Sequence, residues 1–309
     1  MPEIIHTRNL SKQFAEVKAV EDLSFSVQSG EVYGFVGQNG AGKSTTIRML
    51  LTLVRPSNGT ITLFGKDIRT HRRAILQRTG AIIEKPDLYK YLTALQNISI
   101  IAKLSGIHAT QKQLLQQLEK VGIAERANSK VKTFSQGMKQ RLGIACALVH
   151  DPELIILDEP TNGLDPQGIA DVRNLILHLS KNEGKTIFVS SHLLNEMELI
   201  ADSMLIIDQG KKLAEGKVDA ILNPADTLVE IDTTNNNTTK AILQQSQWNR
   251  GLQKSEKIIL KMHRKEIPGL TRYLVENNID VLAIRPKHSL EDYFLSLTTA
   301  NQHVAAYQN

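Results

Sequence analysis

GQNGAGKST, residues Gly37 to Thr45, decides the fold of this chain. It follows an apolar run over residues 32–36, typical of a buried β-strand, and precedes a helical pattern over residues 44–53. Glycines allow backbone conformations that turn consecutive N–H groups inward around a polyphosphate, and the positive end of the following helix faces the same anion. We therefore predict a nucleotide-binding loop made of Gly37, Gln38, Asn39, Gly40, Ala41, Gly42, Lys43, Ser44 and Thr45.

Two side chains of this loop have specific predicted roles. Lys43 brings a full positive charge to the β- and γ-phosphates, and the Ser44 hydroxyl is a ligand for Mg²⁺. The alternative interpretation is a chance glycine-rich turn, which the strand–turn–helix context disfavours. The predicted cofactors are thus a nucleotide and Mg²⁺.

A second stretch, LIILDEP at residues 154–160, supplies the acidic groups that such a site needs. An apolar strand delivers Asp158 and then Glu159 at its carboxyl end, which is where open α/β sheets place their ligands. Asp158 can hold Mg²⁺ through water, and Glu159 can polarise an attacking water. A strand that ends in a solvated acidic turn remains the alternative, and the nearby phosphate loop argues against it.

Composition limits the classes of protein to which the chain can belong. It has 309 residues, 41% hydrophobic and 22% charged, as in an ordinary globular protein. The amino-terminal stretch lacks the apolar core of a signal peptide, and the longest apolar runs fall far short of the roughly 20 residues that span a bilayer. The single cysteine, Cys146, excludes an intrachain disulfide and favours a reducing, cytoplasmic setting.

The charge pattern excludes two further classes of site. A net charge of +5 is mild, and no concentrated basic tail is present, so we predict no nucleic-acid partner. The nine histidines are scattered and have no metal-ligand spacing with cysteine.

Apolar runs alternate with helical patterns along most of the chain, which is typical of an α/β fold with a parallel sheet and helices on its faces. The predicted strands are residues 32–36, 60–64, 80–83, 154–158, 186–190 and 204–208. The predicted helices are residues 44–53, 93–104, 111–121, 136–149, 167–181 and 193–200.

This pattern ends near Asn223, so we predict two domains, residues 1–222 and 223–309. The second is expected to be a small α+β domain, with residues 232–239 as a loop. Its predicted strands are residues 228–232, 257–263 and 281–285, and its predicted helices are residues 239–247, 267–277 and 290–297.

With these motifs in place, residues 3–222 resemble the ATP-binding subunits of ABC transporters. FVGQNGAGKST matches the Walker A loop of that family, and LIILDEPTNGLD matches its Walker B strand and D-loop. The resemblance implies a P-loop NTPase cassette with a parallel core sheet, an antiparallel β subdomain and a helical subdomain. It also implies that His192, at the end of VSSH, contacts the γ-phosphate, and that Phe14 stacks on adenine. A loop histidine and a half-buried strand aromatic are the alternatives for these two residues.

FSQGM, residues 134–138, resembles the signature of that family with two residues changed. In the family each signature helix caps the ATP that is held by a second subunit. The resemblance implies that Ser135 caps this helix and offers its hydroxyl, and that Gly137 lets a backbone N–H approach the γ-phosphate. The changed positions, Gln136 and Met138, fall where a side chain is tolerable.

Glu84 stands where the family usually has a glutamine that binds Mg²⁺ and the attacking water. A glutamate can also be a ligand, but it cannot donate a hydrogen bond when ionised. This glutamate, SQGMKQR and the stretch AIRPKHSLEDYFLSLT are similar to the bacitracin-type and lantibiotic-immunity branch of exporters.

The resemblance implies an ATPase that uses ATP and Mg²⁺ and works as a homodimer. It also implies a separate transmembrane permease subunit above the dimer, at the cytoplasmic face of the membrane, and a role in exporting peptide antibiotics. Residues 84–92 are expected to pass the movement to the membrane subunit. A soluble ABC-type ATPase and a nucleotide-sensing interaction protein are the alternatives.

The predicted helix over residues 290–297 has apolar side chains at a spacing of three and four. Ser289 is its expected cap, with Glu291 and Asp292 in the first turn. Two interpretations stay open: the apolar stripe closes the core of the small domain, or it packs against the ATPase domain or a second copy. Its apolar members are Leu290, Tyr293, Phe294 and Leu297.

Overall fold

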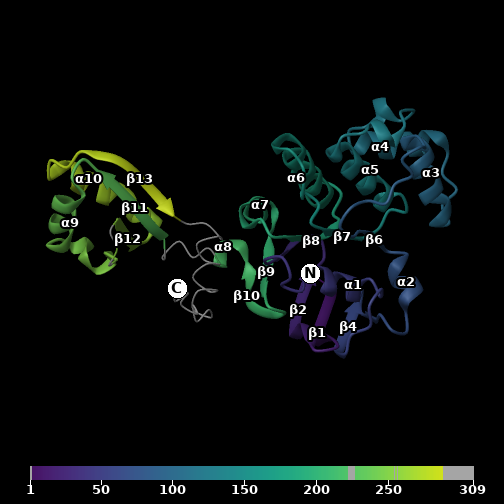
Figure 1. Cartoon of the computed structure of the whole chain (residues 1–309), viewed down its shortest axis with the longest axis horizontal. Helices are drawn as coiled ribbons and strands as arrows, with labels where there is room; N and C mark the ends of the chain where they lie inside the picture. Colours follow the sequence, from purple (N-terminus) through teal and green to yellow (C-terminus); the bar gives the residue numbers. More distant parts are fainter. Residues whose placement is uncertain (1, 222–226, 254, 256, 288–309) are drawn as a thin grey trace, which may run out of the picture. The chain divides into compact units, whose positions relative to one another are not determined.

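The computed structural model describes residues 2–221, 227–253, 255 and 257–287. The chain divides into two compact units, Met1–Lys217 and Val218–Asn309 (Figure 1). The predicted domain boundary between residues 222 and 223 and the predicted helix over residues 290–297 lie outside the described residues.

The first unit is built around a six-stranded sheet with the order β10-β9-β3-β8-β7-β6. Every adjacent pair except β9–β10 is parallel, as the alternation of strands and helices predicts. All five residues of β3 and of β7 are buried, because helices cover both faces of the sheet. The strands are β3 (Val32–Val36), β6 (Thr79–Ile82), β7 (Leu154–Asp158), β8 (Thr186–Ser191), β9 (Ser203–Asp208) and β10 (Lys211–Lys217).

A second, antiparallel sheet has the order β2-β1-β4-β5. The sequence analysis missed its first two strands, because several breaks in their pairing register interrupt the alternation of apolar and polar residues. This sheet and helix α1 (Lys43–Leu50) share one hydrophobic cluster with β3, β7, β8 and β9. The strands are β1 (Glu3–Phe14), β2 (Val17–Gln28), β4 (Asn58–Leu63) and β5 (Lys66–Asp67).

Helix α1 was predicted to continue to residue 53, and this prediction was wrong at its carboxyl end. The helix ends at Leu50, and Thr52 takes a left-handed conformation with φ 59°. Such a residue cannot continue a right-handed helix, so the chain turns there toward β4.

The other face of the six-stranded sheet carries the remaining long helices of this unit. A Cβ on Gly34 of β3 would lie 3.3 Å from the Cβ of Ala201 and 3.7 Å from the sulfur of Met197. Because Gly34 has no side chain, α7 (Leu194–Ile200) can approach β3 closely at this point. Thr93 and Thr110 form capping boxes at the starts of α3 (Ala94–Leu104) and α4 (Gln111–Lys120). The remaining helices are α2 (Arg72–Leu76), α5 (Gln136–Leu148) and α6 (Pro166–Lys181).

The second unit has a three-stranded antiparallel sheet, β12-β11-β13, and its own hydrophobic core. Trp248, Leu270 and Leu274 pack against the buried residues of the sheet, so the helices of the unit close this core. The elements are α8 (Val218–Ile221), β11 (Thr227–Thr233), α9 (Asn236–Gln244), β12 (Ile258–Met262), α10 (Ile267–Glu276) and β13 (Val281–Lys287).

The prediction of a loop over residues 232–239 was wrong for most of that stretch. β11 continues to Thr233, and α9 begins at Asn236 because the side chain of Asn235 accepts a hydrogen bond from the Thr238 N–H at 3.1 Å. Asparagine favours helix starts as strongly as turns, and here it begins a helix. None of the helices in the described part of the chain combines the length and the hydropathy that a membrane-spanning segment needs.

Candidate functional site

The loop between β3 and α1 has the backbone geometry that its sequence requires. Gly40 and Gly42 have φ values of 83° and 105°, a region that residues with a side chain rarely adopt. A Cβ on Gly42 would lie 2.5 Å from the carbonyl oxygen of Ala19, and one on Gly37 would overlap the carbonyl of Ile207. The loop therefore has this shape only with glycine at these positions.

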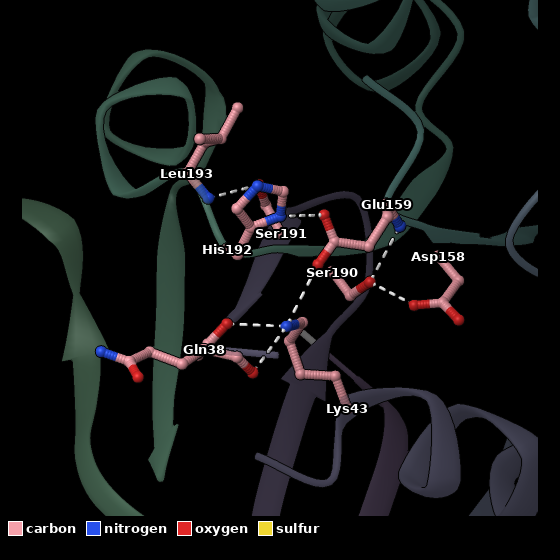
Figure 2. A network of polar contacts seen from close by, with 9 residues as sticks. Gln38, Lys43, Asp158, Glu159, Ser190, Ser191, His192 and Leu193 are labelled. Carbon is pink, nitrogen blue, oxygen red and sulfur yellow. Dashed lines mark hydrogen bonds and ion pairs between the residues drawn. The ribbon is translucent and has the colours of Figure 1, made fainter. Parts of the chain in front are cut away.

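Lys43 is nearly buried, and its ammonium group lies among acceptors at the mouth of this loop (Figure 2). Its Nζ donates to the carbonyl oxygens of Gly37 at 2.6 Å and Gln38 at 3.1 Å. The same atom lies 3.1 Å from Oε1 of Glu159. The structure thus brings together two residues that are far apart in the sequence and that the sequence analysis assigned to one site.

Asp158 and Glu159 are held in place by Ser190, which the sequence analysis did not identify. The Ser190 hydroxyl donates to Oδ1 of Asp158 at 2.6 Å and accepts a hydrogen bond from the Glu159 N–H at 3.0 Å (Figure 2). Asp158 and Ser190 are direct partners in the parallel register of β7 and β8, and both are fully buried. One hydroxyl thus fixes the orientation of both acidic residues.

Glu159 also contacts the predicted switch histidine. Nδ1 of His192 lies 2.7 Å from Oε2 of Glu159, so the carboxylate bridges His192 and Lys43 (Figure 2). Glu159 has φ 49°, a left-handed conformation that is unusual for a residue with a side chain. Strain of this kind is typical of functional sites, where the surrounding contacts hold it.

The acidic end of β7 fits a divalent cation. Oδ2 of Asp158 is buried and has no hydrogen-bond partner among the described residues, although a buried carboxylate oxygen normally has one. A hydrated Mg²⁺ would satisfy this oxygen, with the Ser44 hydroxyl as a second ligand. In the described part of the chain, no group of three or more His, Cys, Asp and Glu side chains could hold a metal ion without further ligands. A Mg²⁺ at this site would need further ligands, such as phosphate oxygens or waters.

The signature stretch has the helix cap that was expected at Ser135. Ser135 is the N-cap of α5 and accepts a hydrogen bond from the Met138 N–H at 3.2 Å. A Cβ on Gly137 would lie 3.7 Å from its nearest neighbour in the chain, Cα of Gly168, which is ordinary contact. Nothing in the described part of the chain therefore requires glycine at position 137.

Two predicted site residues make contacts of a different kind. Glu84 forms a 2.7 Å ion pair with Arg48 of α1, and its side chain is 62% exposed. Phe14 ends β1 and pairs with Val17 of β2, while its ring contacts the ammonium group of Lys12. The metal and adenine contacts predicted for Glu84 and Phe14 stay predictions.

A hollow of about 530 Å³ lies over this site. Its wall contains the phosphate loop and Glu159, and beside them the start of β2 and the start of β10. Val17 lines this hollow, so the β1–β2 turn with Phe14 lies at its edge. The hollow can admit a nucleotide whose phosphates lie on the loop.

Known proteins match the chain along almost its entire length. It is 43% identical to the bacitracin transport ATP-binding protein BcrA of Bacillus licheniformis, across 96% of this chain and 98% of that protein. The chain belongs to the ATP-binding proteins of ABC transporters. The family model described as ABC transporter matches residues 20–162.

Two further comparisons each cover 71% of the chain. The lantibiotic transport ATP-binding protein SrtF of Streptococcus pyogenes is 40% identical over 71% of this chain and 93% of its own length. A solved ATP-binding subunit of an ABC transporter superposes with a TM-score of 0.63 at 32% identity, covering 71% of this chain and 91% of the other. The predicted α/β cassette fold and the family resemblance are thereby confirmed.

Proposed function

We propose that this chain binds Mg²⁺-ATP at the loop around Lys43 and hydrolyses it to drive a transporter. ATP hydrolysis is general to the family to which the chain belongs. The observation that carries the proposal is the bridge from Lys43 through Glu159 to His192. It brings an ammonium group that can bind phosphate, a carboxylate and an imidazole together beside one loop.

Each of these groups has a role in the proposed reaction. Lys43 and the loop N–H groups bind the β- and γ-phosphates, and Glu159 orients the attacking water and accepts its proton. Nδ1 of His192 binds Glu159, which leaves Nε2 of the ring to contact the γ-phosphate. Asp158 and Ser44 would hold Mg²⁺, which when bound neutralises phosphate charge.

The proposed motor is a dimer of this chain beneath a separate membrane subunit, at the cytoplasmic face of the membrane. Homologues in the family work as dimers with transmembrane subunits. Ser135 and Gly137 of one copy would contact the γ-phosphate held by the other. The cap at Ser135, and the fact that no contact in the described part of the chain requires a glycine at position 137, support this assignment.

The proposed cargo is a peptide antibiotic or a similar amphiphile that is exported. Relatives named for bacitracin and lantibiotic transport support this class of cargo. Disruption of the gene is expected to raise susceptibility to bacitracin or a lantibiotic, in a growth assay complemented by the intact gene. Unchanged susceptibility to both antibiotics would reject the proposed cargo. It would not bear on the proposed ATPase activity.

The test of the ATPase is Glu159→Gln, with Glu153→Gln as the matched control. Glu159→Gln removes the charge that accepts the proton, so turnover should fall at least about a hundredfold while ATP binding is kept. Glu153 also flanks β7, but its exposed carboxylate pairs with Arg78 outside the site, so its change should leave turnover close to that of the parent. Phosphate release from the Glu159→Gln protein at the parent rate would disprove the assignment.

A further inference from the structure

A second hollow, of about 770 Å³, lies where the chain turns from α1 into β4 and from β5 into α2. Three arginines line it, Arg55, Arg69 and Arg72, and no acidic residue does. The hollow over the phosphate loop has three lysines in its wall but also Glu21 and Glu159. The arginine-lined hollow thus has more excess positive charge in its wall than the proposed nucleotide site.

Hydrogen bonds hold two of the three arginine side chains at this hollow. Nε of Arg72 donates to Oγ1 of Thr52 at 2.6 Å, and Thr52 is the left-handed residue that ends the α1 turn. This bond uses one of the five N–H groups of Arg72, and no bond of the others is found among the described residues. Arg72 can therefore bind an anion with the two terminal nitrogens of its guanidinium group.

The second arginine is held by a carboxylate. The side chain of Arg69 donates to the Asp67 carboxylate through Nη2 at 2.7 Å and through Nε, which lies 3.1 Å and 3.2 Å from its two oxygens. Its Nη1 has no hydrogen bond among the described residues. The pair fixes the plane of the guanidinium group, so less side-chain freedom is lost when an anion binds.

The third arginine is anchored through its backbone. The carbonyl of Arg55 accepts a hydrogen bond from Nζ of Lys12 at 2.9 Å, and its guanidinium group makes no hydrogen bond or ion pair with the described residues. Together the three side chains have a charge of +3, which Asp67 reduces by one at Arg69. Like charges around one hollow repel each other, so an anion between them is stabilised.

The rest of the lining indicates what the anion carries. Val54, Pro56 and Ile68 belong to the wall, and Ile68 is buried against the hydrophobic cluster beneath α1. Such a surface can contact the carbon part of a ligand, while the arginines bind its charged end. Arginine matches the oxygen geometry of phosphate with paired hydrogen bonds.

From this arrangement we propose that the hollow of Arg55, Arg69 and Arg72 binds the phosphate group of a small organic phosphate. The ligand is a phosphate ester with a short carbon part, such as an anionic lipid headgroup or a free glycerol phosphate. This site is separate from the phosphate loop, and the proposal does not rest on ATP hydrolysis.

The test compares Arg72→Ala and Arg55→Ala with Arg73→Ala in the full-length chain. Arg73 follows Arg72 on α2, is exposed and does not line the hollow, so its change removes the same charge without touching the site. One arm measures sedimentation with phosphatidylcholine vesicles, with and without phosphatidylglycerol. The other arm measures binding of glycerol 3-phosphate by calorimetry, with MgADP present to occupy the phosphate loop.

We expect roughly tenfold weaker binding for Arg55→Ala and Arg72→Ala and no change for Arg73→Ala. Weaker vesicle binding by Arg55→Ala and Arg72→Ala identifies a lipid headgroup as the ligand. Weaker binding by these variants in the calorimetric arm alone identifies a free phosphate ester. Both results support the site. Equal loss in all three variants would mean that only bulk charge matters, and this outcome or no binding in either arm would overturn the proposal. Arg72→Lys keeps the positive charge but loses the paired N–H donors of the guanidinium group. Intermediate binding by this variant would show that these donors bind the phosphate and that the loss in Arg72→Ala is not due to misfolding.

Discussion

Ser190→Ala tests whether one hydroxyl organises the acidic end of β7. The change removes a 2.6 Å bond to the Asp158 carboxylate and a 3.0 Å bond from the Glu159 N–H, both inside the protein. A hydrogen bond to a charged group contributes about 1.5–3 kcal/mol, and a buried N–H without a partner costs about 1–3 kcal/mol. Since the two losses share one site and are not additive, we expect the free energy of unfolding to fall by about 2–4 kcal/mol.

The matched control is Ser180→Ala. Ser180 is also buried, and its hydroxyl donates one 3.0 Å bond to the carbonyl of Gly30, away from the candidate site. Loss of this neutral bond is expected to lower the free energy of unfolding by about 1 kcal/mol. Urea denaturation of both variants beside the parent measures the difference.

Turnover gives the second readout. Without Ser190 the Asp158 carboxylate and the Glu159 backbone can rotate, and a displacement of about 1 Å at a reacting group can lower a rate about a hundredfold. We expect Ser190→Ala to lower the ATPase rate at least about tenfold and to need more Mg²⁺ for half-maximal rate, while Ser180→Ala keeps both values. Equal stability loss in the two variants, with ATPase rates within about twofold of each other, would refute the reasoning.

Three other predictions follow from particular contacts. Gly137→Asp should abolish ATP hydrolysis and keep ATP binding by the monomer, because it puts a carboxylate at the proposed γ-phosphate contact. Gln136→Gly should lower the ATPase rate only slightly. An equal loss of rate in the two variants would contradict this assignment. Burial raises the pKa of Cys146 to about 12. At pH 8 the folded chain should therefore resist a thiol reagent that labels the unfolded chain rapidly. Rapid labelling without denaturant would contradict the buried position. The hydrogen bond from Lys185 lowers the pKa of Asp151, so this contact stabilises the fold fully above the unfolded pKa of about 4. The contribution is lost as the pH falls from there through the lower pKa of the folded state. Lys185→Met should therefore lose less stability than the parent when thermal melts are compared at pH 5 and pH 3, and equal losses would exclude the contribution.

The centre of the site could be predicted from sequence because its signals are local. A glycine-rich loop after an apolar strand fixes the position of Lys43, and a second apolar strand fixes Asp158 and Glu159. The carboxyl ends of parallel strands lie at one edge of the sheet, so these groups meet, as the 3.1 Å contact between Lys43 and Glu159 confirms. Phosphate loops are recognisable for this reason: strand, turn and helix lie in one continuous segment.

The parts that sequence did not predict depend on pairing between distant segments. Ser190 acts because β7 and β8 align it with Asp158, and one sequence does not contain this register. The Arg48–Glu84 contact joins α1 to the segment after β6, and no local pattern around Glu84 indicates that it would contact α1. Asn235 was assigned to a loop because asparagine is common in both turns and helix caps, and only the helix that follows distinguishes them.

The placement of α1 and α5 supports a site completed by a second copy. Ala81 of β6 packs into the hydrophobic cluster of α1, whereas a Cβ on the preceding residue, Gly80, would overlap the backbone of Ala147 in α5. Successive residues of a strand point to opposite faces, so α1 and α5 cover opposite faces of the six-stranded sheet, as Figure 1 shows. The loop before α1 lies at the edge where the parallel strands end, next to the face that α1 covers, while Ser135 starts a helix on the opposite face. The signature of a second chain can approach a nucleotide on that loop from outside, which is why Gly137→Asp is expected to affect hydrolysis and leave binding by one copy intact.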